Sequence, residues 1–314
     1  MKIVVTGALG HIGSALIRDL PLRFAEAEIV LIDNLSTQRF PSLFELPADG
    51  RYRFVEADVR DADLPALFAG AHCVVHLAAM TDAAGSADRA RDVEANNYRA
   101  TEAVAKACLA TGARLIHLSS TSVYGTQDRT VTEDCAAGDL KPQSPYAAIK
   151  LKEEQWVAAL VAQGLNAAIC RFGTIFGVSP GMRFHTAVNK FCWQAAMGQP
   201  LTVWRTAYEQ MRPYLDLADA VRAIVFIIER DLFDGRIYNV LTLNATVRDI
   251  VEALRAVVPD LQVSFVDSPI MNQLSYDVSP QRFRKAGFVF TGDIHRGIAG
   301  TVALLRAAGG VGRR

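Results

Sequence analysis

The sequence predicts an α/β protein built on a doubly wound parallel sheet, and three observations lead to this fold class. Short, continuously apolar runs alternate with longer helical patterns over the first half of the chain. Such runs are typical of strands covered on both faces, as in a parallel sheet. Glycines cluster directly after the first run, and beyond residue 177 the regular alternation gives way to a more mixed texture. The 314 residues suit one large domain or two unequal ones.

The individual elements follow from apolar runs and from helical periodicity. We expect strands over residues 2–7, 28–33, 52–58, 72–79, 113–120, 165–172 and 237–241. We expect helices over residues 12–20, 93–111, 145–163, 218–230 and 247–258.

The stretch VTGALGHIGS places Gly7, Gly10 and Gly13 directly after the first strand, where a helix begins. Glycines there allow a tight turn and a close approach of the backbone to a pyrophosphate. In this context the GxxGxxG spacing predicts a dinucleotide site, which includes His11 and Ile12. The alternative is a glycine-rich turn that serves packing only.

Acidic residues end the second and third strands. Asp33 lies 20 residues past Gly13, where a carboxylate can bind an adenosine ribose and would repel a 2′-phosphate. Asn34 follows and no arginine comes immediately after it, which favours NAD over NADP. Asp58 and Val59 are placed to meet the adenine edge, although an Asp that merely ends a strand is the alternative.

The predicted domain division follows from these assignments. Residues 1–172 are expected to form an NAD-binding domain of Rossmann type, to which a segment near 218–242 returns. Residues 173–217 and 243–308 would form a smaller, mostly C-terminal α/β part that binds substrate. Residues 309–314 would be a flexible tail.

The stretch SPYAAIK places Tyr146 and Lys150 just inside a helix that Ser144 and Pro145 would start. At i and i+4 the two side chains share one face of the helix. An ammonium group beside a phenol lowers the phenol's pKa, which makes tyrosine a usable base near neutral pH. The alternative is an amphipathic helix with a chance Tyr/Lys pair.

With these motifs the chain resembles the extended short-chain dehydrogenase/reductase family, in particular its NAD-dependent nucleotide-sugar epimerases and dehydratases. The resemblance covers nearly the whole chain. Its motifs are TGALGHIGS, DNLS, DVRD, HLAA, NNYRAT, SSTSVYG, PQSPYAAIK, RFGTIFG and RPYLDLADA.

The resemblance implies roles for individual residues of this chain. Ser120 would bind the reacting sugar oxygen, Tyr146 would be the base, and Lys150 would assist it and hold the nicotinamide ribose. Further cofactor contacts would come from Leu77, Ala78, Ala79 and Asn96. Substrate contacts would come from Thr81, Ser120, Thr121, Ser122, Tyr146, Thr174, Arg183 and Arg212, of which Arg212 would clamp the nucleotide diphosphate.

Three departures from the family pattern concern the substrate. Thr174 stands where many relatives carry an asparagine, and residues 267–277 lack the Arg-Pro-Gly-Asp run that usually supplies a second diphosphate arginine. Residues 203–212 replace the usual Gly-Asp-Gly turn. Arg183 is a candidate for the second clamp, and a solvated loop arginine is the alternative.

The residues after Ser120 indicate the reaction. Dehydratases of the family typically carry Asp and Glu there, and decarboxylases a glutamate at the second position, whereas this chain has Thr121 and Ser122. Neither is a practical general acid at neutral pH. This favours a 4-epimerase that works through a 4-keto sugar. A dehydratase, decarboxylase or 4-keto reductase is the alternative among enzymes, and a non-catalytic dinucleotide-binding regulatory protein is the alternative of another class.

The composition of the chain limits the classes of binding partner that we expect. Lys+Arg and Asp+Glu balance at 33 each, so the chain offers no overall charge for nucleic acid or an anionic membrane. We find no apolar stretch long enough for a membrane span. Five scattered cysteines and no Cys/His cluster predict reduced thiols in a cytoplasmic protein without a metal site. The resemblance implies a homodimer that packs through residues 93–111 and 146–163.

Overall fold

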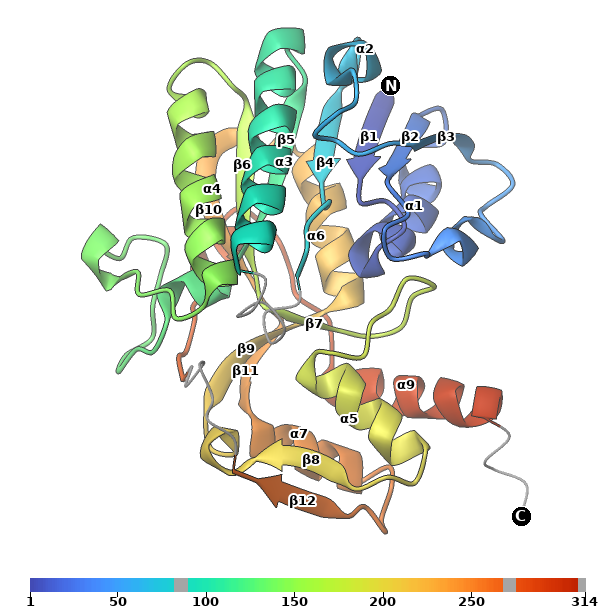
Figure 1. Ribbon diagram of the computed structural model, residues 1–314, viewed down its shortest axis with the longest axis vertical. Coiled ribbons are helices and arrows are strands. Elements are labelled where there is room, and N and C mark those ends of the chain that lie inside the picture. Colours follow the sequence, from blue (N-terminus) through green and yellow to red (C-terminus); the bar gives the residue numbers. More distant parts are fainter. Residues whose placement is uncertain (82–89, 268–274, 310–314) are drawn as a thin grey trace.

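The main layer of the protein is a sheet of parallel strands, seen in a computed structural model that describes residues 1–81, 90–267 and 275–309 (Figure 1). Within these residues the sheet has seven strands in the order β10-β6-β5-β4-β1-β2-β3. Every neighbouring pair runs parallel. The strands are β1 (Lys2–Thr6), β2 (Glu28–Asp33), β3 (Arg51–Glu56), β4 (Cys73–His76), β5 (Arg114–Ser120), β6 (Ala167–Phe172) and β10 (Asp234–Val240).

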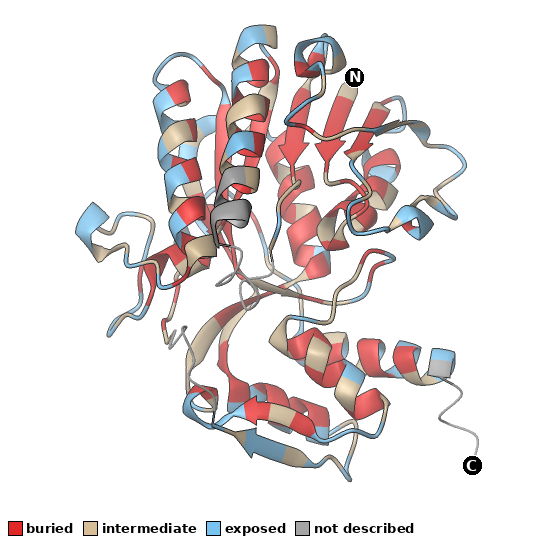
Figure 2. Cartoon of the chain, viewed as in Figure 1, coloured by how far each residue is buried: buried red, intermediate tan, exposed pale blue. Residues whose placement is uncertain are grey.

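Helices cover both faces of this sheet. Helices α1 (His11–Arg23) and α6 (Leu217–Glu229) pack on one face, and α2 (Leu64–Phe68), α3 (Ala90–Thr111) and α4 (Pro145–Val161) on the other. Along β1, Ile3 and Val5 join the first apolar cluster while Val4 joins the second. Successive strand side chains point to opposite faces, so a strand between two helical layers must be apolar throughout. Figure 2 shows the inner strands of the sheet buried, whereas the edge strand β3 is exposed or half-buried, and the predicted doubly wound α/β class is confirmed.

A smaller assembly lies beyond the carboxyl ends of the large sheet (Figure 1). Its strands are β7 (Thr174–Phe176), β8 (Leu201–Trp204), β9 (Met211–Asp216), β11 (Leu243–Thr246) and β12 (Val263–Val266). They form a β11-β9-β7 sheet and a β12-β8 pair. Its helices, α5 (Ala187–Ala196), α7 (Val247–Arg255) and α9 (Ile294–Gly309), share one apolar cluster.

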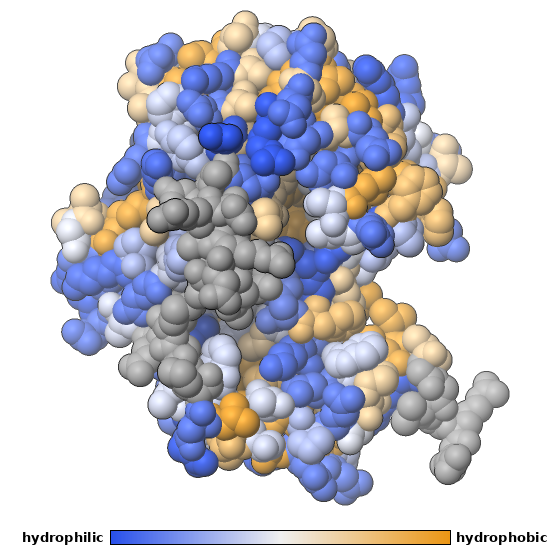
Figure 3. All heavy atoms as spheres, in the orientation of Figure 1, coloured by the Kyte–Doolittle hydropathy of each residue, from blue (hydrophilic) through white to orange (hydrophobic). Residues whose placement is uncertain are grey.

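The short elements complete the described chain. They are α8 (Gln281–Lys285) and the 3-10 helices η1 (Phe40–Leu43), η2 (Thr121–Tyr124), η3 (Ala137–Asp139) and η4 (Arg205–Ala207). On the face shown in Figure 3, hydrophilic and hydrophobic side chains intermingle, as expected for a chain of balanced charge. In the part of the chain that the structure describes, no helix is both long and apolar enough to span a bilayer.

The strand order places a binding crevice. The chain proceeds from β1 outward to β2 and β3, and then returns to the other side of β1 with β4 and β5. In open α/β sheets such a reversal leaves a crevice at the carboxyl ends of the strands, where ligands bind. Gly7 follows β1, Leu77 follows β4, and Ser120 ends β5, so all three lie at this edge.

Helix α4 is tied to the sheet by a buried ion pair. Arg171 on β6 donates from Nε and Nη2 to the two carboxylate oxygens of Glu154, at 2.9 and 2.6 Å. Their side chains are 2% and 3% exposed. Ser119 Oγ on β5 donates to the same carboxylate at 2.5 Å. The carboxylate thus joins α4 to two neighbouring strands.

Removing the arginine would leave this carboxylate buried without its counter-charge. We expect Arg171→Met to lower the free energy of unfolding by about 3–5 kcal/mol, measured by urea denaturation. Arg255→Met is the matched control, because Arg255 pairs with Glu252 in the open, at 45% and 55% exposure. It should cost less than about 1 kcal/mol. Equal losses in the two variants would contradict the assigned role.

Candidate active site

The glycine-rich turn has the geometry of a dinucleotide cradle. Gly7 has φ +66°, and a Cβ there would lie 2.6 Å from Ala78 N and 2.7 Å from the Leu77 carbonyl carbon. Only glycine fits such an approach. Gly10 caps α1 without a side-chain hydrogen bond, so the helix N-terminus presents its backbone N–H groups to an anion. The turn fits the pyrophosphate of NAD.

Asp33 is fixed at the edge of this cradle. Its Oδ2 accepts the Leu9 N–H at 3.1 Å, and its Oδ1 accepts the Leu35 N–H at 3.0 Å. The carboxylate is therefore oriented by the backbone on both sides. Each carboxylate oxygen can accept more than one hydrogen bond, so Asp33 retains acceptor capacity for a ribose hydroxyl.

Asp58 is held mainly by side chains, with one further hydrogen bond from the Arg60 backbone N–H to Oδ1 at 2.9 Å. Arg60 donates to its two oxygens at 2.8 and 2.7 Å, and Asn34 Nδ2 donates to Oδ2 at 2.9 Å. The Arg60 hydrogen bond holds the pKa of Asp58 far below its usual value. Val59 is buried. The side chains of Asp58 and Asn34, both predicted to bind the cofactor, are thus hydrogen-bonded to each other. Arg60, which the sequence analysis did not include, is a further partner of Asp58.

The segment after β4 closes the cradle from the other side. Leu77, Ala78 and Ala79 are half-buried along the crevice edge. Asn97 fixes the end of this segment, because its amide exchanges two hydrogen bonds with the Met80 backbone, both at 2.8 Å. Asn96, which was predicted as a cofactor contact, donates from Nδ2 to Asn97 Oδ1 at 3.1 Å. The two adjacent asparagines in the NNYRAT motif are the only sequence signal that points to Asn97.

A loop from the smaller assembly lies across the glycine-rich turn. A Cβ on Gly181 would meet the Leu9 and Gly10 carbonyl oxygens at 2.4 and 2.5 Å, so the two backbones are in close contact. Burial lowers the pKa of His11 to about 4, which keeps its ring neutral at pH 7. We call the contact between the 177–181 loop and the glycine-rich turn the clasp. Its hydrogen bonds are His11 Nε2 with Gly177 O (2.8 Å), Ser179 Oγ to His11 O (2.8 Å), Gly181 N to Ser14 Oγ (2.9 Å) and Arg39 Nη1 to Gly181 O (2.5 Å).

Tyr146 and Lys150 lie in the first turns of α4. Ser144 Oγ accepts the Ala147 N–H at 3.1 Å and Pro145 occupies the first helical position, as predicted for this helix start. Lys150 Nζ lies 6.0 Å from the centre of the Tyr146 ring. It donates to Leu118 O on β5 at 3.0 Å, which anchors it beside the end of that strand.

The electrostatics of this pair differ from the sequence-based expectation. Burial raises the pKa of Tyr146, and the Lys150 ammonium lowers it, but Glu153 opposes the lysine. The net direction in the protein without cofactor is upward. The expected lowering by Lys150 operates but does not prevail, because burial and a carboxylate absent from the SPYAAIK motif work against it.

The hydroxyl residues after β5 separate into two groups. Ser120 Oγ lies 2.8 Å from Ser122 Oγ and accepts the Ser122 N–H at 3.2 Å, so both hydroxyls stay at the half-buried end of β5. Thr121 turns inward, where its hydroxyl donates to Phe172 O and meets Tyr276 Oη, both at 3.3 Å. Helix α4 packs against both β5 and η2, and Lys150 reaches Leu118 O, so the start of α4 lies beside the end of β5.

Three of the predicted substrate residues, Thr174, Arg183 and Arg212, belong to the smaller assembly. Arg183 is close enough to lower the pKa of both Tyr146 and His11 by its charge. Arg212 lies on β9 and donates to Gln210 Oε1 at 3.2 Å. Thr174 on β7 pairs with Tyr214 on β9, two residues after Arg212.

Two other observations complete the placement. Thr81 Oγ1 is buried and has no hydrogen-bond partner in the described part of the chain. The predicted departure over residues 267–277 lies largely outside the described residues, as does the predicted tail over 309–314. Their assignments stay predictions.

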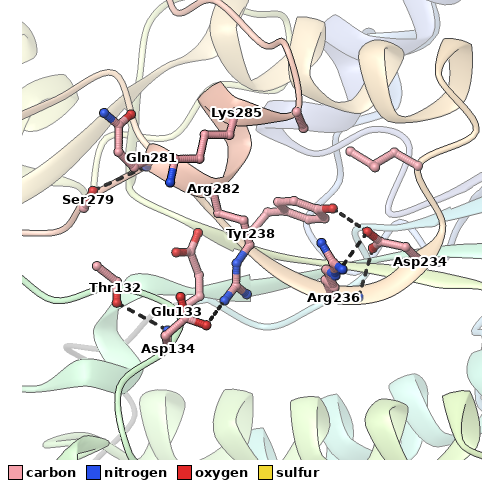
Figure 4. A pocket seen from close by; sticks show the side chains of 12 residues that line it. Thr132, Glu133, Asp134, Asp234, Arg236, Tyr238, Ser279, Gln281, Arg282 and Lys285 are labelled. Carbon is pink, nitrogen blue, oxygen red and sulfur yellow. Dashed lines mark hydrogen bonds and ion pairs between the residues drawn. The ribbon is translucent and has the colours of Figure 1, made fainter.

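A separate cavity of about 650 Å³ lies where the 132–134 loop, β10 and α8 meet (Figure 4). Charged side chains there pair with one another: Arg282 with Asp134, and Arg236 with Asp234 at 3.7 Å. None of the site residues predicted from the sequence lines it. We therefore place the active site at the sheet's carboxyl edge.

A nucleotide cradle at the switch point of a parallel sheet, beside a Ser/Tyr/Lys set, defines a dinucleotide-dependent enzyme of the short-chain dehydrogenase/reductase type. Residues 3–240 match the model of the "NAD dependent epimerase/dehydratase family". The chain belongs to this family, whose cofactor is NAD. When bound, NAD would be held by the glycine-rich turn, by Asp33 and by Lys150.

Relatives of known activity place the chain within this family. It is 27% identical, over 300 residues, to the trifunctional UDP-glucose 4,6-dehydratase/UDP-4-keto-6-deoxy-D-glucose 3,5-epimerase/UDP-4-keto-L-rhamnose-reductase of Arabidopsis thaliana; the match covers 91% of this chain but only 44% of that protein. It is 35% identical over 162 residues, half of each chain, to the UDP-glucose 4-epimerase of Mycolicibacterium smegmatis. The structure of UDP-glucuronic acid 4-epimerase from Bacillus cereus superimposes with a TM-score of 0.87, at 24% identity over 98% of this chain and 100% of that one.

The close contact in the clasp predicts that adding one methyl group at Gly181 disturbs both folding and NAD binding. Gly181→Ala would force the loop away from the glycine-rich turn, and we expect a loss of about 1–3 kcal/mol in the free energy of unfolding. We also expect about tenfold weaker NAD binding by calorimetry, equal to about 1.4 kcal/mol. Gly138→Ala is the control, since a Cβ there meets nothing within 4 Å. Unchanged NAD affinity in Gly181→Ala would show that the clasp does not support the cradle.

Proposed function

We propose that the protein is an NAD-dependent nucleotide-sugar 4-epimerase. The observation that carries this proposal is the absence, in the described site, of a carboxylic acid placed for elimination chemistry. Thr121 and Ser122 occupy the positions after Ser120, and Thr121 faces the core. Glu153 and Glu154 are buried and paired with Lys150 and Arg171. The reaction left to such a site is a reversible proton and hydride exchange.

The proposed steps use the residues at the end of β5 and the start of α4. Tyr146 takes the proton from the sugar's C4 hydroxyl, while Ser120 holds the same oxygen by a hydrogen bond. NAD, when bound, would supply the acceptor and donor of the C4 hydride. The 4-keto sugar turns in the site between these events, so the hydride returns to the opposite face. Tyr146 then gives its proton back, and the enzyme ends unchanged.

Basic residues of the smaller assembly support a nucleotide-diphosphate sugar as substrate. Arg212 on β9 provides a fork of donors suited to a diphosphate. Arg183 supplies a second positive charge near Tyr146. Arg183 also lowers the pKa of His11 in the glycine-rich turn, so its charge lies near both the cradle and the proposed base, which suits an anionic substrate bound there.

The alternatives within the family differ in their net reaction. The Arabidopsis thaliana relative combines dehydratase, epimerase and reductase activities. A 4-keto reductase consumes NADH, whereas an epimerase leaves its amount unchanged. Absorbance at 340 nm during turnover of a panel of nucleotide sugars, with NMR of the products, separates these reactions.

One prediction from the proposed mechanism concerns Tyr146 as the base. Tyr146→Phe removes the only group proposed to exchange the C4 proton, and general acid–base catalysis contributes about 10²–10⁴-fold to rate. We expect turnover to fall by that factor while NAD affinity, measured by calorimetry, stays within about twofold, or about 0.4 kcal/mol. Near-normal turnover on a confirmed substrate would refute the role of Tyr146.

We also propose a cytoplasmic homodimer that packs through α3 and α4. All five cysteines are free, which suits a reducing compartment. The two helices present an aromatic and cationic cluster, in which Tyr98 and Trp156 lie 6.3 Å apart. Lys152 lies over the Tyr98 ring and Lys106 over the Trp156 ring, at 4.4 and 5.4 Å. Aromatic residues of this kind are enriched at interfaces.

The dimer surface is tested by inserting a charge. We expect Trp156→Glu to convert the protein to monomers in light scattering, because an unpaired carboxylate in an interface is costly. Trp193→Glu is the control, since Trp193 is 39% exposed on α5, away from the proposed surface. A dimer that persists in Trp156→Glu would place the interface elsewhere.

A further inference from the structure

Glu153 lies one helical turn after Lys150 and is completely buried. Its Oε2 accepts from Lys150 Nζ at 2.8 Å and lies 3.5 Å from His117 Nε2 on β5. Within the described residues, Glu153 Oε1 and both ring nitrogens of His117 have no hydrogen-bond partner. The carboxylate therefore stands between the proposed catalytic lysine and a histidine, and is only partly satisfied.

The neighbouring carboxylate shows what a structural role looks like in the same helix. Glu154 accepts two hydrogen bonds from Arg171 and one from Ser119, so its buried charge is fully compensated. Glu153 has no such set of donors. A buried, incompletely bonded carboxylate is costly, and an apolar residue would pack there at lower cost. Its position beside Lys150 is what distinguishes it.

The histidine does not supply a positive charge to this carboxylate. Burial lowers the pKa of His117 well below its usual value, and the charge of Lys150 lowers it further. His76 on β4 stacks beside it at 6.2 Å between ring centres and is likewise buried, with its pKa lowered to about 3. Both rings are neutral at pH 7. Lys150 is thus the cation that Glu153 neutralises.

We propose that Glu153 is a positioning residue that holds the Lys150 ammonium and sets the pH at which the Tyr146–Lys150 pair loses its first proton. With Glu153 ionised, the Glu153–Lys150 pair is neutral overall, and the first proton lost from Tyr146 leaves a net negative charge in a buried site. Without that carboxylate the same loss turns a positive cluster neutral. The second process is easier in a medium of low dielectric constant.

The directions of the pKa shifts of Lys150 and Tyr146 agree with this geometry. Burial lowers the pKa of Lys150, but Glu153, followed by Tyr146 and Glu154, raises it overall. Glu153 also raises the pKa of Tyr146, while Lys150 and Arg183 lower it. From β5 and β4, the neutral His117 and His76 face the cluster. The carboxylate on α4 is therefore the group that most directly opposes the lysine.

The test follows the titration of the pair rather than turnover. The protein, saturated with NAD, is labelled with [ζ-13C]tyrosine and [ε-13C]lysine, and Tyr146→Phe and Lys150→Met assign the two NMR signals. We expect Glu153→Gln to move the first proton loss of the pair to lower pH by about one unit or more. Both signals are followed, because two coupled groups share their titration steps.

Two further variants make the outcome decisive. Glu153→Asp keeps the carboxylate charge but moves it away from Lys150 by one methylene group. In this variant the pair should lose its first proton at a pH between those of the wild type and Glu153→Gln. Glu102→Gln removes a half-buried carboxylate on α3 that is paired with Lys106, and it should leave the titration unchanged. A first proton loss at unchanged or higher pH in Glu153→Gln would overturn the proposal. Should Glu153→Gln fail to fold, Glu153→Asp decides alone: a lower titration supports the proposal, and wild-type titration overturns it.

This inference rests on the proposed roles of Tyr146 and Lys150, and not on epimerisation itself. The NMR titration needs no substrate. A protein that proved to be a reductase would still show the shift in Glu153→Gln, whereas an epimerase without the shift would refute the role of Glu153 alone.

Discussion

Buried charges on helix α4 have to be neutralised where they stand, and this requirement places the helix against the sheet. Lys150 reaches Leu118 O on β5, and Glu154 reaches Arg171 on β6. An ion in the protein interior is tolerated only when its partners are fixed, so small shifts of α4 along the sheet are penalised. The proposed base on the first turn of the helix takes its place from these anchors.

The same physical logic sets where chemistry can occur. The central strands are apolar on both faces, so polar side chains gather where the strands end. The order reversal between β1 and β4 opens that edge to a ligand. The smaller assembly carries Arg183 and Arg212, the two arginines that we propose for binding the substrate. Arg183 lies near enough to His11 and Tyr146 to lower the pKa of both, although it is far from each of them along the chain.

Much of the fold could be predicted because it depends on local patterns. The strands β2 and β6 and the starts of α4 and α7 lie within two residues of the predicted bounds, since apolar runs and helix caps act locally. The strands β7, β8, β9, β11 and β12 were missed. They are three to six residues long, and their pairings join segments distant in sequence, so short runs carry too little periodicity.

The site was predictable where a motif encodes it and not where tertiary packing decides. Gly7, Tyr146 and Lys150 belong to motifs whose spacing has a physical reason. Glu153, by contrast, is an ordinary acidic residue in a helix until β5 places His117 beside it. The direction of the Tyr146 pKa depends on that neighbour and on burial, which no spacing reveals.

The clasp between the glycine-rich turn and the 177–181 loop has a consequence for the order in which the molecule assembles. Gly7 and Gly10 leave the ribosome more than 160 residues before Gly181, and the sheet receives its edge strand β10 only at residues 234–240. During synthesis, β6 therefore waits with an unpaired edge, and the nucleotide turn waits without its covering loop. Contacts of such long sequence separation form late and slowly. The nascent chain carries an open sheet edge until residues 234–240 emerge and pair with it.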